Sequence, residues 1–459
     1  MPLSQLDDLS TSSSKVTFEE SMKPTKPSSG FIPILKNRHF LLLWIGQVFS
    51  QLADKIYLVL MIVLIESHFT ADPHTISSWG GAIMIANTIP AVLFGSLAGV
   101  YVGRWSKKGV LVVSNLIRGM LVLTIPLLLW VFQDKITLFN LNLGVITLFI
   151  ITFSISTFTQ FFAPAEQATI PLIVKSNNLL SANSLFTTTM MGALIIGLAL
   201  GSPLLELAGN WHIGKEFVVG GSYIIAGFLL LLLQTGEKTI RHPQETKEES
   251  NHVLQDIRSG IIYLQKNHTV GNALIQLIIL FCIFAALAVL ALSIAEQIPT
   301  LKAEQFGFLL AAGGVGMAGS AAILGQWGEK FSPTHLSFWG LIGVAGSLVG
   351  LSFYTHQLGM TLFMTALLGW FGAFVAVPMQ TTIQAETPEN MRGKVFGLQN
   401  NAVNIALSLP LALAGVAENW FGLERVLLGL AILALVGGVL TWYISDRMKS
   451  KFSFLTRID

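Results

Sequence analysis

Asp54 is the residue whose type and position most clearly point to chemistry, because its carboxylate lies within a long apolar stretch. A charged Asp at the centre of a bilayer costs about 2.5 to 3.5 kcal/mol on insertion scales, which makes such a residue a candidate for function. Spacings of three and four residues place it on one helical stripe with other polar side chains, so the stripe is expected to face a water-filled cavity. The stripe consists of Gln47, Ser50, Gln51 and Asp54.

Two interpretations of Asp54 are open at the level of sequence. It is either a carboxylate whose protonation and deprotonation drive a conformational change, or a structural carboxylate that bonds to a neighbouring helix. Glu296, near the outer end of another apolar stretch, is a second candidate for the cavity, with an exposed carboxylate at the outer mouth as the alternative. The other acids near the ends of stretches are expected to be solvated or bonded to loops. These are Glu166, Glu206, Glu386 and Glu418.

The remaining reactive residue types form no recognisable site. The single cysteine, Cys282, excludes an internal disulfide framework and a metal site built from several cysteines. The histidines lack metal-ligand spacing, and no P-loop pattern is present. A polytopic membrane transferase would need an Asp-rich metal motif or a His and Asp pair at working spacing, and the sequence has neither. We therefore expect no cofactor, no metal and no enzymatic activity.

The elements that must position Asp54 are membrane-spanning helices. Of the 459 residues, 53% are hydrophobic and 11% are charged, whereas soluble domains run near a quarter charged. The net charge of +2 gives no strongly basic face for nucleic acid. A spanning helix needs about 20 mostly apolar residues. Twelve such stretches occur, at approximately 39 to 66, 79 to 102, 109 to 132, 141 to 163, 183 to 209, 217 to 235, 271 to 299, 305 to 327, 334 to 354, 359 to 383, 395 to 418 and 422 to 445.

The twelve stretches fall into two groups of six around a charged segment, residues 236–270. The second part of this segment has Ile257, Ile261 and Leu264 at the spacing of an amphipathic helix on the membrane surface, with a solvated linker as the alternative. We predict an N-terminal six-helix bundle over 36–235 and a C-terminal one over 271–445. Residues 1–35, rich in Ser, Thr, Pro and Lys, and residues 446–459 are predicted to be cytoplasmic tails, the first of them disordered.

Lys and Arg are distributed unevenly between the two sides of the predicted bundle. With the amino terminus inside, 21 of the 27 lie on the inner side. Because cytoplasmic loops collect these residues, both termini and the central segment are predicted to be cytoplasmic. Four of the other six lie on the outer side: Lys135, Lys215, Lys302 and Arg425. The last two, Lys55 and Arg118, lie within spans.

The turn between the second and third stretches combines glycines with basic residues. Glycines four residues apart let a helix approach a neighbour closely, and a short basic loop anchors to the inner membrane surface. Together with twelve spans in two groups, this turn resembles that of the major facilitator superfamily, in which an Asp and basic residues form a charged latch between the halves. Gly103 stands where that family has its Asp, so a gating role and plain anchoring are both open. The residues are Gly95, Gly99, Gly103, Arg104, Lys107 and Lys108.

Two further segments resemble the macrolide-type drug:proton antiporters and the related siderophore exporters. One runs from Phe161 to Leu185 after the fourth stretch, and the other from Gln384 to Gly397 between the tenth and eleventh. In the second segment Pro388 disfavours helix before it, and flexible backbone is expected to begin the next span. A mobile inner connection and a simple helix break both fit. The candidate residues are Glu386, Pro388, Arg392 and Gly393.

The fifth stretch contains Gly197, Gly201 and Pro203, similar to the antiporter motif of the same span. A proline inside a span kinks the helix, and glycines thin it for close packing. The bend is either a pivot at the interface of the two halves or a packing kink.

The resemblance implies an all-α membrane transporter with twelve helices in two six-helix bundles, which exports an amphipathic small molecule by alternating access. Inward proton flow is the expected driving force. A siderophore exporter or a lysophospholipid flippase would keep every motif, and Gly103 leaves a transport-inactive sensor or scaffold as a further alternative. The expected partners are a small-molecule substrate, protons and membrane lipid. The expected form is a monomer in the plasma (inner) membrane.

Overall fold

The computed structural model describes residues 30–69, 73–132, 137–138, 141–209, 213–237, 249–300 and 306–455. Twelve of its helices are long and apolar enough to cross a membrane, which confirms the predicted all-α membrane fold. The first six are α3 (Arg38–His68), α4 (Pro73–Arg104), α5 (Lys107–Val131), α6 (Leu143–Ile173), α7 (Leu179–Ala208) and α8 (Gly214–Leu231). The last six are α10 (His268–Gln297), α11 (Gly307–Trp327), α12 (Pro333–Phe353), α13 (Leu358–Glu386), α14 (Glu389–Phe421) and α15 (Leu423–Leu455).

The other elements are short or lie between the two groups of six. Helix α9 (Glu249–Lys266) occupies the charged central segment, and α2 (Phe31–Leu35) precedes the first span. Two 3-10 turns, η2 (Ser176–Asn178) and η4 (Gly328–Lys330), follow α6 and α11. Strands β1 (Thr137–Leu138) and β2 (Leu141–Asn142) form an antiparallel pair between α5 and α6. The domain boundaries given above stay predictions.

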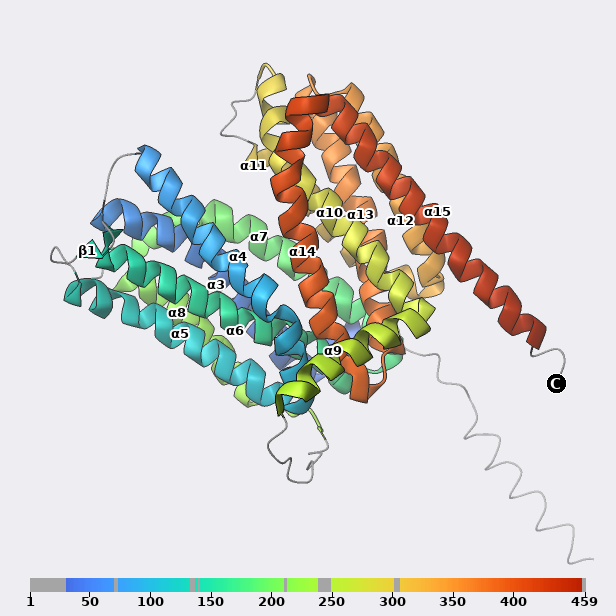
Figure 1. The fold of residues 1–459 in the computed structure, drawn as a ribbon, viewed down its shortest axis with the longest axis horizontal. Coiled ribbons are helices and arrows are strands. Elements are labelled where there is room, and N and C mark those ends of the chain that lie inside the picture. The colour runs from blue at the N-terminus through green and yellow to red at the C-terminus, as the bar shows by residue number, and fades with distance from the viewer. Residues whose placement is uncertain are drawn as a thin grey trace, which may run out of the picture.

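The two groups of six form two bundles that are not parallel. Figure 1 shows their helices converging where α9 lies and diverging away from it. The bundles meet chiefly through α4 with α14 and through α7 with α11. We call the end that carries α9 the inner end and the opposite end the outer end.

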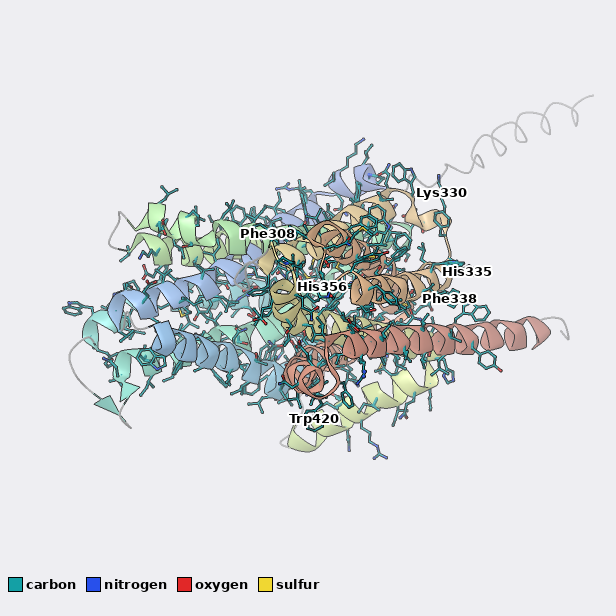
Figure 2. The ribbon with its side chains drawn as sticks, turned by 90° about the horizontal axis from the view of Figure 1, so that it is seen from above. Phe308, Lys330, His335, Phe338, His356 and Trp420 are labelled. Atoms are coloured by element: carbon teal, nitrogen blue, oxygen red, sulfur yellow. The ribbon has the colours of Figure 1, made fainter. Side chains whose placement is uncertain are left out.

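Large apolar side chains cover the outside of the molecule as well as its core. Trp420 is 77% exposed and Phe308 is 58% exposed, and both are marked in Figure 2. Soluble monomers rarely expose extensive apolar patches, whereas in a bilayer the lipid tails cover them. This exterior and the twelve spans make the chain a multi-pass integral membrane protein.

Prolines account for two of the errors in the predicted span boundaries. The fourth span was expected to end near residue 163, but α6 continues through Pro164 and Pro171 to Ile173. A proline removes one backbone hydrogen bond, and neighbouring helices in a membrane bundle compensate for that loss.

The start of α14 also differs from the prediction. Pro388 is the N-cap of this helix, which begins at Glu389 instead of near residue 395. Gly393 therefore lies within the helix, and the prediction of flexible backbone at this position was wrong.

The two ends of the chain are more helical than expected. The predicted tail reached residue 35, but Phe31–Leu35 form α2, and Ile34 is only 2% exposed. The last span was expected to stop near 445, whereas α15 runs to Leu455. Residues 1–29 and 456–459 of the predicted tails lie outside the described residues.

The close helix approach expected from the glycine spacing lies between α4 and α14. A Cβ added to Gly99 would be 2.1 Å from the Cα of Gly397 and 2.7 Å from the carbonyl oxygen of Gly393. A Cβ on Gly393 would in turn be 2.2 Å from the Cα of Gly103. Two backbones touch here with no side chain between them. We call this contact, formed by Gly95, Gly99, Gly103, Gly393 and Gly397, the glycine seam.

We predict that Gly99→Ala lowers stability, because the added methyl group meets backbone that cannot move aside. Overpacking of this kind costs about 1 to 3 kcal/mol. Thermal unfolding in detergent measures the effect as a lower melting temperature. Gly346→Ala is the matched control, since nothing lies within 4 Å of its added Cβ and alanine favours helix. Equal melting temperatures for the two variants would contradict the prediction.

Candidate functional site

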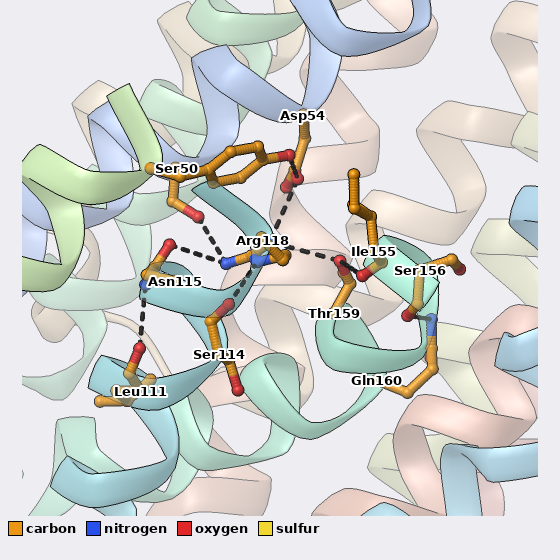
Figure 3. A network of polar contacts seen from close by, with 11 residues as sticks. Ser50, Asp54, Leu111, Ser114, Asn115, Arg118, Ile155, Ser156, Thr159 and Gln160 are labelled. Atoms are coloured by element: carbon orange, nitrogen blue, oxygen red, sulfur yellow. Dashed lines mark hydrogen bonds and ion pairs between the residues drawn. The ribbon is translucent and has the colours of Figure 1, made fainter. Parts of the chain in front are cut away.

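The guanidinium of Arg118 on α5 is the centre of a polar network inside the first bundle (Figure 3). Its side chain is 0% exposed, and its Nη1 forms an ion pair with Oδ1 of Asp54 on α3 at 3.1 Å. Nη1 also donates to Oγ1 of Thr159 at 3.3 Å. Nη2 donates to Oγ of Ser50 at 3.0 Å and to Oδ1 of Asn115 at 2.8 Å. A buried charge in a membrane requires such complete compensation.

Two aromatic rings and a backbone carbonyl complete the enclosure of Arg118. Its Cζ lies 4.8 Å from the ring centroid of Phe162 on α6 and 4.7 Å from that of Tyr223 on α8. Both distances fall within the range of cation–π attraction. Nε donates to the carbonyl oxygen of Ser114 at 3.3 Å. Four helices, α3, α5, α6 and α8, therefore surround one side chain.

This network divides the core of the first bundle into two apolar layers. The outer cluster includes Ala53, Val122 and Ile155, and the inner cluster includes Leu111 and Phe162. Arg118 lies between them on α5. The polar network is thus a middle layer with apolar packing on both sides.

Asp54 connects the network to a cavity between the bundles. Its side chain is 24% exposed, and the Tyr223 hydroxyl donates to its Oδ1 at 2.5 Å. The cavity has a volume of about 720 Å³, which is within the range of small-molecule sites. Its apolar wall includes Leu58, Ile85, Ile89, Val92, Leu93, Ile155 and Leu407. Its polar residues include Asp54, Lys55, Asn87, Ser156, Thr159, Gln160, Asn404 and Ser408.

Amide side chains close the inner side of this cavity by bonding across the two bundles. Oε1 of Gln160 on α6 accepts hydrogen bonds from Nδ2 of Asn400 at 2.9 Å and from Nδ2 of Asn404 at 3.2 Å, both on α14. Nearer the inner end, Nδ2 of Asn183 on α7 donates to Oε1 of Gln384 on α13 at 2.8 Å. The hydrogen bonds found between the bundles of the described chain lie in the inner half or the middle of the helices.

The basic turn between α4 and α5 forms an ion pair with a carboxylate on α9. Arg104 Nη2 lies 2.7 Å from Oδ2 of Asp256, and Lys394 Nζ on α14 lies 2.8 Å from Oδ1 of the same residue. Oε1 and Oε2 of Glu237 accept from the Lys107 backbone N–H at 3.0 and 3.1 Å, which satisfies the start of α5. Asp256 therefore bridges the two bundles, although Gly103 replaces the Asp of the family pattern.

The bridge is ionised at physiological pH. Burial alone would raise the pKa of Asp256, but hydrogen bonds from Lys394 and Arg104 outweigh burial and lower the pKa below its ordinary value. A carboxyl with a lowered pKa stays charged until the pH falls through that value. The bridge is consequently lost only in acid.

The other three residues predicted to face the cavity lie away from its wall. Gln47 is buried, and its Oε1 has no hydrogen-bond partner among the described residues, while Gln51 is half-buried. Glu296 is exposed near the outer end of α10. None of the three lines the cavity that holds Asp54.

Gly197 and Gly201 of α7 pack against α3 within the first bundle. A Cβ on Gly197 would lie 2.5 Å from Cβ of Lys55 on α3, and one on Gly201 would lie 3.2 Å from Cγ2 of Val59. Pro203 is exposed on the same helix. These contacts show that the two glycines let α7 approach α3 closely, and the pivot stays a prediction.

The connection between α13 and α14 is held to α9. The carbonyl oxygen of Glu386 accepts a hydrogen bond from the Tyr263 hydroxyl at 3.1 Å, and Nε of Arg392 donates to the carbonyl oxygen of Thr387 at 3.2 Å. Lys108 is half-buried at the start of α5. Among the described residues, no cluster of three or more His, Cys, Asp or Glu could hold a metal ion.

Three charged residues of the site escaped the sequence analysis. Arg118 was located within a span but was not paired with Asp54, although a second buried charge of opposite sign was a usable signal. Asp256 was counted only as one of many charges in the central segment. Glu166 was expected to be solvated or loop-bonded, which was wrong: it is 8% exposed, because α6 continues past Pro164.

Comparison with known proteins agrees with this architecture. A family model described as transmembrane secretion effector matches residues 28–451. The chain is 22% identical over 417 residues to the MFS-type transporter YfiS of Bacillus subtilis, covering 89% of this chain and 94% of YfiS. It is 26% identical over 302 residues to the enterobactin exporter EntS of Citrobacter koseri, covering 61% of this chain and 67% of EntS.

Solved structures share the fold at low sequence identity. A bacterial homologue of the iron transporter ferroportin, in an outward-facing state, matches with a TM-score of 0.64 at 15% identity, covering 90% of this chain and 99% of that one. The human organic anion transporter TETRAN matches with a TM-score of 0.63 at 14% identity, covering 88% and 99%. With two bundles of six spans and a family model that matches nearly its whole length, the chain belongs to the transmembrane secretion effector family of the major facilitator superfamily.

Proposed function

We propose that this protein exports an amphipathic small molecule by alternating access and that inward proton flow drives the export. The observation that carries the proposal is the cavity between the bundles, with the Asp54–Arg118 ion pair in its wall. A carboxylate that is partly exposed to the cavity and bound to a buried guanidinium can exchange a proton with cavity water. Protonation of Asp54 would weaken its hold on Arg118, so proton binding would alter contacts among α3, α5, α6 and α8.

The arrangement of the bundles supports one particular state of the transport cycle. The amide contacts, the glycine seam and the Asp256 bridge close the inner end, while the bundles diverge toward the outer end (Figure 1). The excess of Lys and Arg at the inner end favours the cytoplasm as its side of the membrane, with both termini there. We therefore assign the structure to an outward-open state in the plasma (inner) membrane.

The charges of the cavity favour a substrate with an acidic group. Arg118 neutralises Asp54, whereas Lys55 has no acidic partner among the described residues. One ammonium group remains in a wall that is otherwise apolar or neutral. An amphipathic molecule with an anionic or strongly accepting group complements such a wall better than a cation does.

A siderophore is the second, narrower candidate. The likeness to the enterobactin exporter EntS supports it, and the acidic hydroxyl groups of a catecholate siderophore would suit Lys55. A lysophospholipid, with its phosphate, would fit the same charge. The transport-inactive alternative depended on Gly103, and its support weakens because Asp256 supplies a carboxylate to Arg104.

Flux through purified protein in proteoliposomes tests the proposal. We would present enterobactin, a lysophospholipid and the cationic dye ethidium under an imposed pH gradient. We expect one of the two acidic probes to move against its concentration gradient, and a protonophore to stop this movement. Movement of ethidium alone would contradict the substrate class. Absence of flux for all three probes, with either sign of the gradient, would favour the sensor or scaffold.

We predict that Asp54→Asn reduces pH-driven flux to the level of empty liposomes, because the exchangeable carboxyl is gone. The variant also removes the ion-pair partner that Arg118 has in this structure, so the melting temperature should fall. Glu206→Gln, which changes an exposed carboxyl on α7, is the control and should keep full flux. Unchanged flux in Asp54→Asn would leave Asp54 with a structural role only.

We predict that Lys55→Gln weakens binding of the transported acidic probe at least about tenfold, because a hydrogen bond to a charged group contributes roughly 1.5 to 3 kcal/mol. Titration calorimetry on purified protein measures the Kd. Lys330→Gln, an exposed lysine at the inner end, serves as control and should leave the Kd unchanged. Equal affinities for both variants would argue against contact between Lys55 and the substrate.

We predict that Asp256→Asn opens the inner end more often, since the variant loses both ion pairs of the bridge. Partly exposed pairs contribute up to about 1 kcal/mol each, which corresponds to a roughly three- to thirty-fold change in population. The readout is maleimide labelling of Ser181→Cys, a fully buried interface position, in a chain with Cys282→Ala.

The matched control for the bridge is Glu389→Gln, an exposed carboxyl at the same end. With Glu389→Gln, Ser181→Cys should be labelled at the same rate as in the chain whose Asp256 bridge is intact. Because the pKa of Asp256 is lowered, the effect of the Asp256→Asn substitution should stay constant between about pH 5 and pH 8. An effect that disappears near the acidic end of this interval would show that the bridge titrates there.

A further inference from the structure

Glu166 is a buried carboxyl group of the first bundle that the proposed mechanism has not used so far. Its side chain is 8% exposed, and its Oε1 is enclosed without a hydrogen-bond partner among the described residues. A carboxylate in such a place would be an uncompensated charge inside a membrane. A neutral carboxylic acid in the same place would carry no such charge.

Glu166 lies on the same stripe of α6 that contacts Arg118. Thr159 bonds to the guanidinium, and the ring of Phe162 covers it at 4.8 Å. Positions 159, 162 and 166 follow the three-and-four spacing of one helical face, so Glu166 is the next position of this face toward the inner end. Arg118 thus has one carboxyl on its outer side and another one turn further in.

The charges of the three groups cannot all be compensated at once. Arg118 and Asp54 are the charged groups whose fields act on Glu166. Around them, the ionisable hydroxyl of Tyr223 faces Asp54. One guanidinium can neutralise one carboxylate, so two carboxyl groups beside a single arginine hold one proton between them. Because Asp54 has the ion pair here, the proton belongs to Glu166.

We propose that Glu166 is the second proton-exchanging residue of the transport cycle: it is neutral in this outward-open state and becomes the ion-pair partner of Arg118 when the inner end opens. The inference rests on the proposed proton-driven transport. Gln47, one turn inward from Ser50 on α3, also has a buried acceptor without a partner, which shows that the inner side of Arg118 is short of donors.

The cycle balances in protons and charge. From outside, a proton binds Asp54 and breaks its bond to Arg118. When the inner end opens, Glu166 releases its proton to the inner water, and Arg118 pairs with the new carboxylate. On return, the proton of Asp54 passes to Glu166, and Arg118 pairs again with Asp54. One proton has crossed inward, and both resting states have one ion pair and one neutral acid.

Infrared spectroscopy of the purified, lipid-embedded full chain at neutral pH tests this assignment without any substrate. We expect a carbonyl band of a protonated carboxylic acid that shifts in heavy water. Glu166→Gln should remove this band, and Glu166→Asp should move it. Glu216→Gln, which changes another buried carboxyl of the same bundle, is the matched control and should leave the band in place. Persistence of the band in Glu166→Gln would overturn the proposal.

A second variant tests the exchange of partners. In Asp54→Asn, Arg118 has only Glu166 to neutralise it, so Glu166 should ionise. The difference spectrum between Asp54→Asn and the double variant Asp54→Asn/Glu166→Gln should then contain no acid carbonyl band. A band in that difference would overturn the exchange even if one of the single variants failed to fold.

Flux separates failure of this inference from failure of the proposed function. If the wild-type chain moves no probe under a pH gradient but the infrared results hold, Glu166 is a neutral acid and the transport proposal is wrong. If the wild-type chain transports and Glu166→Gln transports with unchanged pH dependence, transport stands and the role of Glu166 is refuted. We expect Glu166→Gln to lose pH-driven flux and to keep exchange of labelled for unlabelled probe, which needs no net proton movement.

Discussion

The buried guanidinium of Arg118 is the constraint on which the first bundle depends. A permanent positive charge between two apolar layers is stable only if its N–H donors have acceptors and a negative charge lies beside it. Groups on four different helices supply these partners. Each of these helices is held in register by a contact that cannot move far without exposing the charge. In the proposed mechanism, the loss of the Asp54–Arg118 ion pair would affect the contacts of all four helices together.

The inner end has a different constraint, because the proposed alternating access requires two closely packed helices from separate bundles to separate. At the glycine seam the backbones of α4 and α14 touch at Gly99 and Gly397, whereas a Cβ on exposed Gly103 would make only ordinary contact with Gly393. The charge comes instead from α9, where Asp256 reaches Arg104 and Lys394 from outside the seam. The backbone contact and the ion-pair bridge therefore involve different elements, so that either can be broken while the other remains.

Local sequence patterns predicted most of the fold, but they did not predict the contacts between residues far apart in the sequence. Twelve apolar stretches and the spacing of Gly95, Gly99 and Gly103 were sufficient for the spans and the close approach, because both depend on neighbours along one helix. The pairing of Asp54 with Arg118 joins positions 64 apart, and an opposite charge within a span does not by itself distinguish Arg118 from Lys55 as the partner. Likewise, only the arrangement of α6 in the bundle shows that Pro164 continues the helix and that Glu166 is buried.

Alternating access requires two states of similar free energy, and the inner contacts match this requirement. Each ion pair of Asp256 is partly exposed, at 21% to 25%, so each contributes at most about 1 kcal/mol. The amide bonds that join the bundles can be exchanged for bonds to water when the inner end opens, at about 0.5 to 1.5 kcal/mol each. Several such contacts together hold the closed end, yet no single one is beyond the few kcal/mol that ligand or proton binding can supply. The strongly compensated charge lies within one bundle, and the weak contacts lie between the bundles, which is the distribution that the proposed alternating access requires.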